Sequence, residues 1–109
     1  MIPKSDLEKF VAHLKGRNTT GNVVMMQLRN QDIKPQNLYL EPMGDHLVMP
    51  PGATYVIAGK EWPGTSMSID IRHDGIVVWQ EGHGAVFQDG VAFETTYYLI
   101  CRKLMQEGE

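Results

Sequence analysis

The segment that decides the fold is SMSIDIRHDGIVVW, residues 66–79. Its first half alternates between polar and apolar residues, with residues 67, 69 and 71 on one face, as a half-buried strand does. Asp74-Gly75 then supplies the residue types that a type I′ hairpin turn favours, and an apolar run follows as the partner strand. The segment therefore predicts a β-hairpin. With Asp74 and Gly75 as its two loop residues, Ile71 faces Val78.

Strand-like runs continue on both sides of this hairpin, over residues of about 22–88. Short apolar or alternating runs occupy residues 23–28, 37–41, 46–49 and 53–58, and Pro50-Pro51-Gly52 separates the last two. Asp89-Gly90 predicts either another hairpin or the approach to the last element. We expect a mainly β (α+β) chain, with a small antiparallel β-sandwich or barrel of about six or seven strands. The pattern does not indicate the strand order or whether the sheet closes.

Helices are predicted at both ends of the chain. Ser5 and Glu8 form a capping box ahead of an apolar stripe, which predicts a helix over about 5–15 that Gly16 ends. Residues of about 93–106 carry a second helical stripe, although residues 95–100 also have strand-like propensity. A helix is the preferred interpretation there, and a strand stays open for 94–104. We expect the two helices to cover an open edge or mouth of the β core.

Composition and charge exclude several classes of protein. The 109 residues are 42% hydrophobic and 21% charged, which is typical of a globular chain, and we expect a single domain over residues 1–109. The net charge is −3 and the basic residues are scattered, so we expect no nucleic-acid partner. No apolar run is long enough to span a bilayer and residues 1–6 do not resemble a secretory signal, so we expect a cytoplasmic protein with no membrane partner. The single cysteine, Cys101, is expected to be a small buried residue.

Histidines and acids suggest one alternative site but specify no chemistry. Neither the i, i+4 spacing of helical metal ligands nor a His-x-His pair occurs. A metal site could still be assembled from His46, His83, Asp45 and Glu81 within a β-barrel. Acid–base catalysis needs a paired carboxylate or a His–carboxylate couple in a pocket, and the acids here have structural explanations as turn formers or polar strand positions. We therefore identify no catalytic residue, expect no cofactor, and lean against an enzyme.

One aromatic residue points to a contact surface. Trp62 follows Lys60 and Glu61 in a segment rich in Gly and Pro that predicts a loop between strands. A tryptophan in a loop offers a large rigid area to a partner, so these three residues are the predicted binding residues. The alternative is that Trp62 folds back over one end of the β core.

Two short segments carry weak resemblances. Residues 40–45, LEPMGD, and 49–53, MPPGA, resemble segments of uncharacterised bacterial proteins. A Pro-Gly turn that opens a strand, as Pro51-Gly52 does, also resembles cupin-like barrels. The His-x-His motif and the later glutamate of the cupin metal site are missing, so the resemblance implies no activity and no site.

Three hypotheses for function follow. The first is a small binding or interaction module of unknown function, non-catalytic and self-associating into a homo-oligomer, with Trp62 and its loop as the protein-binding contact. The second is a cupin-like barrel that binds a small ligand or metal, with enzymatic activity left open. The third is an accessory or immunity-type protein that acts through a protein partner.

Overall fold

A computed structural model of the chain describes residues 3–17, 21–61, 66–80 and 84–107. Strands make up more of the described residues than helices do, and a helix lies at each end, which confirms the mainly β prediction. The elements in chain order are α1 (Asp6–Arg17), β1 (Asn22–Arg29), β2 (Gln36–Glu41), β3 (Asp45–Met49), β4 (Thr54–Glu61), β5 (Ser68–Arg72), β6 (Gly75–Trp79), β7 (Gly84–Gln88), β8 (Val91–Ala92) and α2 (Thr96–Glu107).

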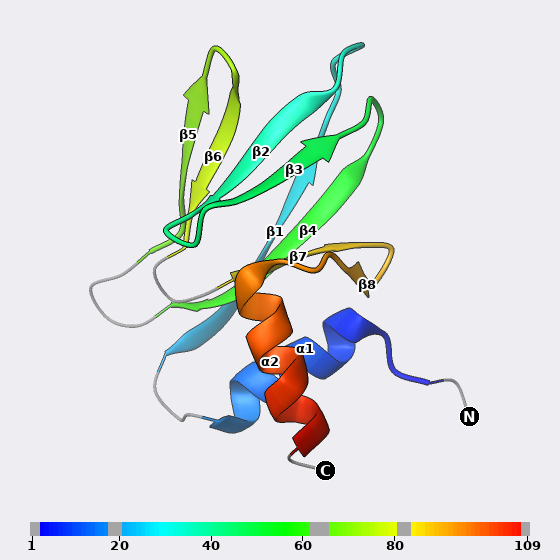
Figure 1. Ribbon diagram of the computed structural model, residues 1–109, viewed down its shortest axis with the longest axis vertical. Coiled ribbons are helices and arrows are strands. Elements are labelled where there is room, and N and C mark those ends of the chain that lie inside the picture. The colour runs from blue at the N-terminus through cyan, green and yellow to red at the C-terminus, as the bar shows by residue number, and fades with distance from the viewer. Residues whose placement is uncertain (1–2, 18–20, 62–65, 81–83, 108–109) are drawn as a thin grey trace.

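The strands form two sheets of four strands that do not close into a barrel (Figure 1). The first sheet has the order β1-β4-β7-β8 and is antiparallel throughout. The second sheet has the order β3-β2-β6-β5, and its central pair, β2 and β6, runs parallel. The hydrophobic pattern did not indicate that parallel pair, because both strands read as short apolar runs whichever way they pair.

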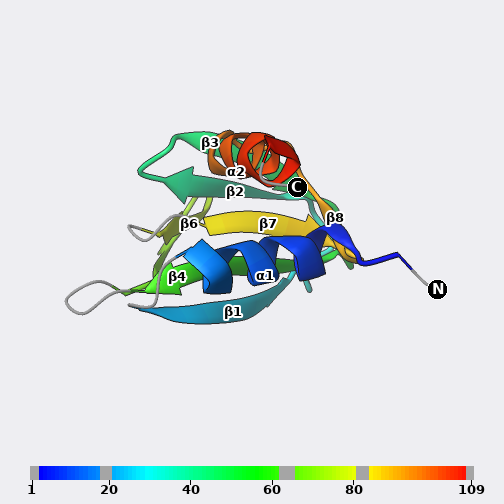
Figure 2. The same ribbon diagram turned by 90° about the horizontal axis from the view of Figure 1, so that it is seen from below.

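The first sheet has a hydrophobic core on each of its faces. One face of β4 and β7 packs against the second sheet, and the other face packs against α1 and α2, which lie beside each other (Figure 2). The buried residues between the sheets are Leu38, Leu40, Met49, Ala53, Tyr55, Ile57, Val78 and Val86. The buried residues between the first sheet and the helices are Phe10, Leu14, Ala58, Ala85, Phe87, Tyr98 and Cys101.

The helices therefore cover an outer sheet face, and the expectation that they cover an edge or mouth is wrong. Ala58 and Ala85 are small residues on that face, and they leave room for large rings from the helices. The Phe10 ring lies 5.4 Å from that of Phe87 and 6.1 Å from that of Tyr98, at tilted angles favourable for aromatic pairs. Of the range 94–104 for which a strand had stayed open, residues 96–104 are helical and belong to α2.

The start of α1 is held as its sequence predicts. The Ser5 N–H donates to Glu8 Oε1 at 3.0 Å, and the Glu8 N–H donates to Ser5 Oγ at 3.1 Å, which is a complete capping box. Asp6 Oδ2 accepts a hydrogen bond from the Ala92 N–H, and the Leu7 N–H donates to the Gly90 carbonyl. The first turn of α1 is thereby joined to the β7–β8 hairpin.

The two Asp-Gly pairs adopt different turns. Asp89 and Gly90 have φ values of 52° and 81°, as a type I′ loop requires, and Gln88 pairs with Val91 across them. In the β5–β6 hairpin, Arg72 pairs with Gly75, so the two loop residues are His73 and Asp74.

The predicted register of the β5–β6 hairpin is therefore wrong by two residues: Ile71 faces Ile76, and Val78 faces Ile69. The physical reason lies in β2. A Cβ on Gly75 would lie 2.5 Å from the Asn37 carbonyl oxygen, and the Asn37 Nδ2 group donates to the Asp74 carbonyl at 2.9 Å. Gly75 is thus the β6 residue on which β2 packs closely, and it is not a loop residue.

Candidate functional site

Of the three residues predicted to form a binding contact, Lys60 and Glu61 are described, and Lys60 has a structural role. Trp62 itself lies outside the described residues. Lys60 is only 3% exposed, and its Nζ donates to the Leu14 carbonyl at 2.8 Å, near the C-terminal end of α1. A cation is favourable there because the last carbonyls of a helix carry partial negative charge. Glu61 is half-buried at the end of β4, opposite Asn22. A partner contact through Trp62 stays a prediction.

The two described residues of the predicted metal site, Asp45 and His46, do not point toward a common position. The Asp45 carboxylate accepts from the Thr96 N–H at 3.1 Å and from Thr96 Oγ1 at 2.9 Å, at the start of α2. His46 is the next residue in β3 and therefore points to the opposite face of the sheet. Its ring stacks on Tyr39 with centroids 4.7 Å apart, and its Nε2 is hydrogen-bonded to Asn37.

Glu81 and His83, the other two predicted ligands, lie outside the described residues. Within the residues that the structure describes, no group of three or more His, Cys, Asp or Glu side chains could hold a metal ion. The four-residue site stays a prediction, and its two described members already have other partners.

Shifted pKa values in the described ranges do not outline an acid–base site. The hydrogen bond from the Ser5 backbone lowers the pKa of Glu8, and burial raises the pKa of Tyr55 and of Tyr98. The two tyrosines belong to different hydrophobic cores, and Glu8 is an exposed helix cap. Proton transfer requires such groups to meet in one pocket, and these three groups do not lie together.

The outer face of the second sheet carries a polar and aromatic row. By register, His46 of β3, Tyr39 of β2 and Asp70 of β5 lie in one row, with the buried Val77 of β6 between Tyr39 and Asp70. The Trp79 Nε1–H group donates to Asp70 Oδ2 at 2.9 Å. These groups bond mainly to one another, which favours a structural role in holding the four strands together.

The edge strand β5 differs from this row because its apolar side chains are exposed. All five of its residues are exposed, and among the described strands it pairs with β6 alone. Ile69 is 40% exposed and Ile71 is 85% exposed. On β6, the same sheet face carries Val78, which is fully buried in the core between the sheets. The core face of the sheet therefore continues at β5 as an uncovered apolar surface.

The backbone of β5 is also open along this edge. Arg72 and Gly75 flank the two-residue loop and therefore form a hydrogen-bonded pair. Along the two strands, hydrogen-bonded pairs then alternate with non-hydrogen-bonded pairs. The N–H and C=O groups of Arg72 and Asp70 thus point toward β6, whereas those of Ile69 and Ile71 point away from the sheet. An exposed edge with unpaired backbone groups is a template for another strand.

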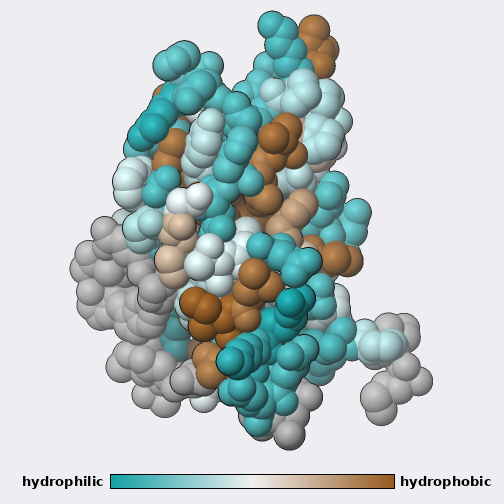
Figure 3. Space-filling model, in the orientation of Figure 1, coloured by the Kyte–Doolittle hydropathy of each residue, from teal (hydrophilic) through white to brown (hydrophobic). Residues whose placement is uncertain are grey.

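Sequence reasoning missed this surface, although it identified the alternation of β5. Period-two alternation shows which side chains share a face, but it does not show whether another layer covers that face. A further apolar area lies on α2, where Figure 3 shows hydrophobic residues gathered. Leu99, Ile100 and Leu104 are 37%, 49% and 37% exposed there.

No helix within the described ranges combines the length and the apolar character needed to cross a membrane. Comparison of the chain with protein-family models, with curated proteins and with solved structures gives no match.

Proposed function

We propose that this chain is a non-catalytic interaction module that self-associates, with the β5 edge as the contact between two copies. The observation that carries the proposal is the 85% exposure of Ile71 on an edge strand whose five residues are all exposed. Two copies paired through β5 would form one continuous sheet of eight strands, because each second sheet has four. Antiparallel pairing about a two-fold axis uses the same strand in both copies, as closed dimers do.

The charges of β5 favour one register of this pairing. When Ile71 lies opposite Ile71 of the other copy, Asp70 lies opposite Arg72 twice across the two-fold axis. Opposite charges in directly facing positions stabilise antiparallel pairs, and like charges destabilise them. A shift of one copy by two residues in either direction places Asp70 opposite Asp70, or Arg72 opposite Arg72.

The backbone allows the same register. Ile71 is a residue whose N–H and C=O groups point away from β6, so two facing Ile71 residues make a hydrogen-bonded pair. Asp70 and Arg72 then form the non-hydrogen-bonded pairs, in which facing Cα atoms are about 4.5 Å apart and side chains approach most closely. The contact covers only a five-residue strand in each copy, so we expect a weak, concentration-dependent dimer.

The test is sedimentation velocity and native mass spectrometry from about 1 µM to about 1 mM protein. Ile71→Lys should weaken dimerisation about tenfold or more, because it removes the apolar contact proposed between the two Ile71 side chains and places two like charges together. The matched control is Ile33→Lys, since Ile33 is 88% exposed and lies between β1 and β2. A wild-type chain that stays monomeric at about 1 mM, or equal effects of the two variants, would overturn the proposal.

Charge reversal tests the register itself. Asp70→Arg alone and Arg72→Asp alone should each weaken the homodimer, because each places like charges opposite one another. An equimolar mixture of the two variants should form a heterodimer, since every facing pair is then of opposite sign. Absence of that heterodimer, with both variants folded by circular dichroism, contradicts this register.

A further inference from the structure

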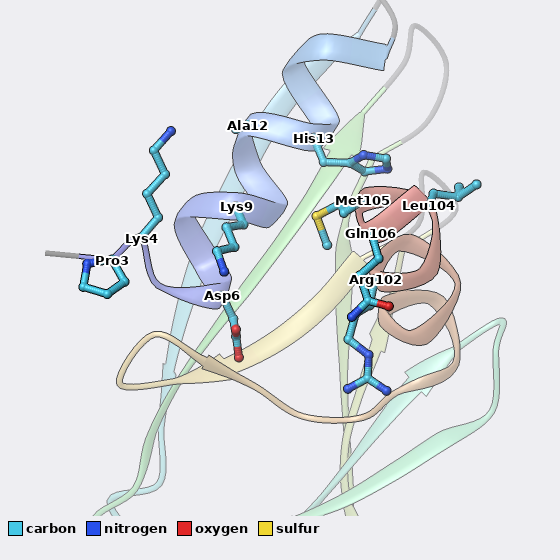
Figure 4. A pocket seen from close by; sticks show the side chains of 10 residues that line it. All are labelled: Pro3, Lys4, Asp6, Lys9, Ala12, His13, Arg102, Leu104, Met105 and Gln106. Carbon is cyan, nitrogen blue, oxygen red and sulfur yellow. The ribbon is translucent and has the colours of Figure 1, made fainter. Parts of the chain in front are cut away.

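A groove lies between α1 and α2 (Figure 4). The two helices lie at the opposite end of the molecule from β5 (Figure 1). Its volume is about 770 Å³, within the range of small-molecule sites. Figure 4 shows Lys9 and Asp6 on the α1 side and Arg102 on the α2 side, with His13 reaching from α1 toward α2. Lys4 also lines the groove, but its side chain extends away from α2 in this view.

The groove is basic on a chain whose net charge is −3. Among its described lining residues, Lys4, Lys9 and Arg102 are cationic and Asp6 is the one carboxylate. That carboxylate is engaged by the Ala92 N–H at 2.9 Å, where it joins α1 to β8. The cationic side chains are therefore in excess over acids within the groove.

Apolar surface lies next to these cations. Ala12 on α1 and Leu104 and Met105 on α2 also line the groove. Met105 is half-buried, and its flexible thioether can adapt to the shape of an apolar group. Cations beside apolar surface are complementary to a molecule that has an anionic end and an apolar body.

We propose that this groove binds an organic anion with an apolar body, such as an aliphatic or aromatic carboxylate, sulfonate or phosphate ester. Lys9 and Arg102 bind the anionic group, and Ala12, Leu104 and Met105 contact the apolar part. Arg102 already has an acidic partner in Glu94, whose Oε2 lies 3.4 Å from the Arg102 Nη2. Because both side chains of that pair are exposed, at 44% and 70%, the pair is weak and Arg102 is able to exchange Glu94 for a ligand.

The probe is anilinonaphthalene sulfonate, a fluorescent aromatic anion, with uncharged N-phenylnaphthylamine as its counterpart. We expect the anion to bind saturably with one molecule per chain, and the uncharged probe to bind about tenfold more weakly. Lys9→Gln and Arg102→Gln should each weaken anion binding about two- to fivefold, which is the usual range for an exposed charge contact.

Two controls locate the binding. Lys103→Gln removes the neighbouring charge of α2 from a residue that does not line the groove, and it should leave the affinity within about twofold. Ile71→Lys changes the β5 edge and should also leave the affinity for the anion unchanged. A wrong groove proposal can therefore be distinguished from a wrong dimer proposal. The inference is overturned by unsaturable binding, by equal affinity for both probes, or by Lys9→Gln and Arg102→Gln variants that are folded but bind as the wild type does.

Discussion

Replacing Asp45 with Ala should destabilise the chain by removing a contact between the second sheet and α2. Asp45 begins β3, and its carboxylate accepts hydrogen bonds from the backbone N–H and the hydroxyl of Thr96, the first residue of α2. The residue before the helix, Thr95, is 2% exposed, and its Oγ1 has no hydrogen-bond partner among the described residues. The capping acceptor of α2 is therefore supplied by Asp45, from a residue 51 positions away.

The magnitude follows from the two roles of this carboxylate. Loss of a capping side chain costs about 1 kcal/mol, and loss of a negative charge at a helix N-terminus costs about 0.5 kcal/mol more. The entropy of unfolding is about 2.1 cal/mol/K per residue, so 1 kcal/mol corresponds to about 4 °C for a chain of 109 residues. Asp45→Ala should thus lower the Tm by about 6 °C. Asp45→Asn should lower it less, because Asn also accepts hydrogen bonds at helix N-termini.

The assay is thermal unfolding followed by circular dichroism for Asp45→Ala, Thr96→Ala and the double variant. Because the two side chains share a hydrogen bond, the double variant should lose less stability than the sum of the single losses, by about 1 kcal/mol. Additive losses, or an unchanged Tm in Asp45→Ala, would refute the capping argument. If EDTA lowered the wild-type Tm by the same amount as Asp45→Ala, the result would instead support the predicted metal site.

Four further predictions concern stability. Gly75→Ala should cost about 1–3 kcal/mol, because φ is +152° and a Cβ would lie 2.5 Å from a carbonyl oxygen of β2. Urea unfolding measures this loss. In the same assay, Gly16→Ala should stabilise the chain, because a Cβ added near the end of α1 meets open space. Glu8→Gln should destabilise it at neutral pH, because hydrogen bonds from Ser5 lower the pKa of Glu8 below 4.5. That difference should shrink as the pH falls through the lowered pKa, and a pH-independent difference would contradict it. Phe10→Ala should cost about 3–5 kcal/mol by urea unfolding, since the ring is fully buried against three other rings, and a cost below about 1 kcal/mol would contradict this packing.

Elements that depend on neighbouring residues could be predicted from the sequence. The capping box of Ser5 and Glu8 starts α1 as expected, because both hydrogen bonds form within one helical turn. Cys101 is buried as expected, and α2 covers most of the range predicted for it. The capping box forms within one helical turn, and for α2 and Cys101 the local apolar pattern agrees with the packing against α1 and the first sheet.

Features that depend on distant residues could not be predicted in the same way. Asp74-Gly75 and Asp89-Gly90 are equivalent as dipeptides, yet only the second forms the two-residue loop. The difference arises from Asn37, which packs on Gly75 and bonds to Asp74 from another strand. Likewise, no local signal marks Asp45 as the cap of α2 rather than a metal ligand, because its partner is Thr96.

The correction of the hairpin register changes how the candidate site is understood. With residues 73 and 74 in the loop, Ile69 and Ile71 face Val78 and Ile76, so the core face runs unbroken from β6 to β5. An edge protected only against aggregation would best carry charges of one sign, since like charges repel in every register. The β5 strand carries Asp70 and Arg72 instead, two residues apart and on one face. In the proposed register, Asp70 of each copy lies opposite Arg72 of the other, and the two charges attract. Each adjacent register instead places two like charges opposite one another. The two residues therefore select one register while leaving the edge open to pairing.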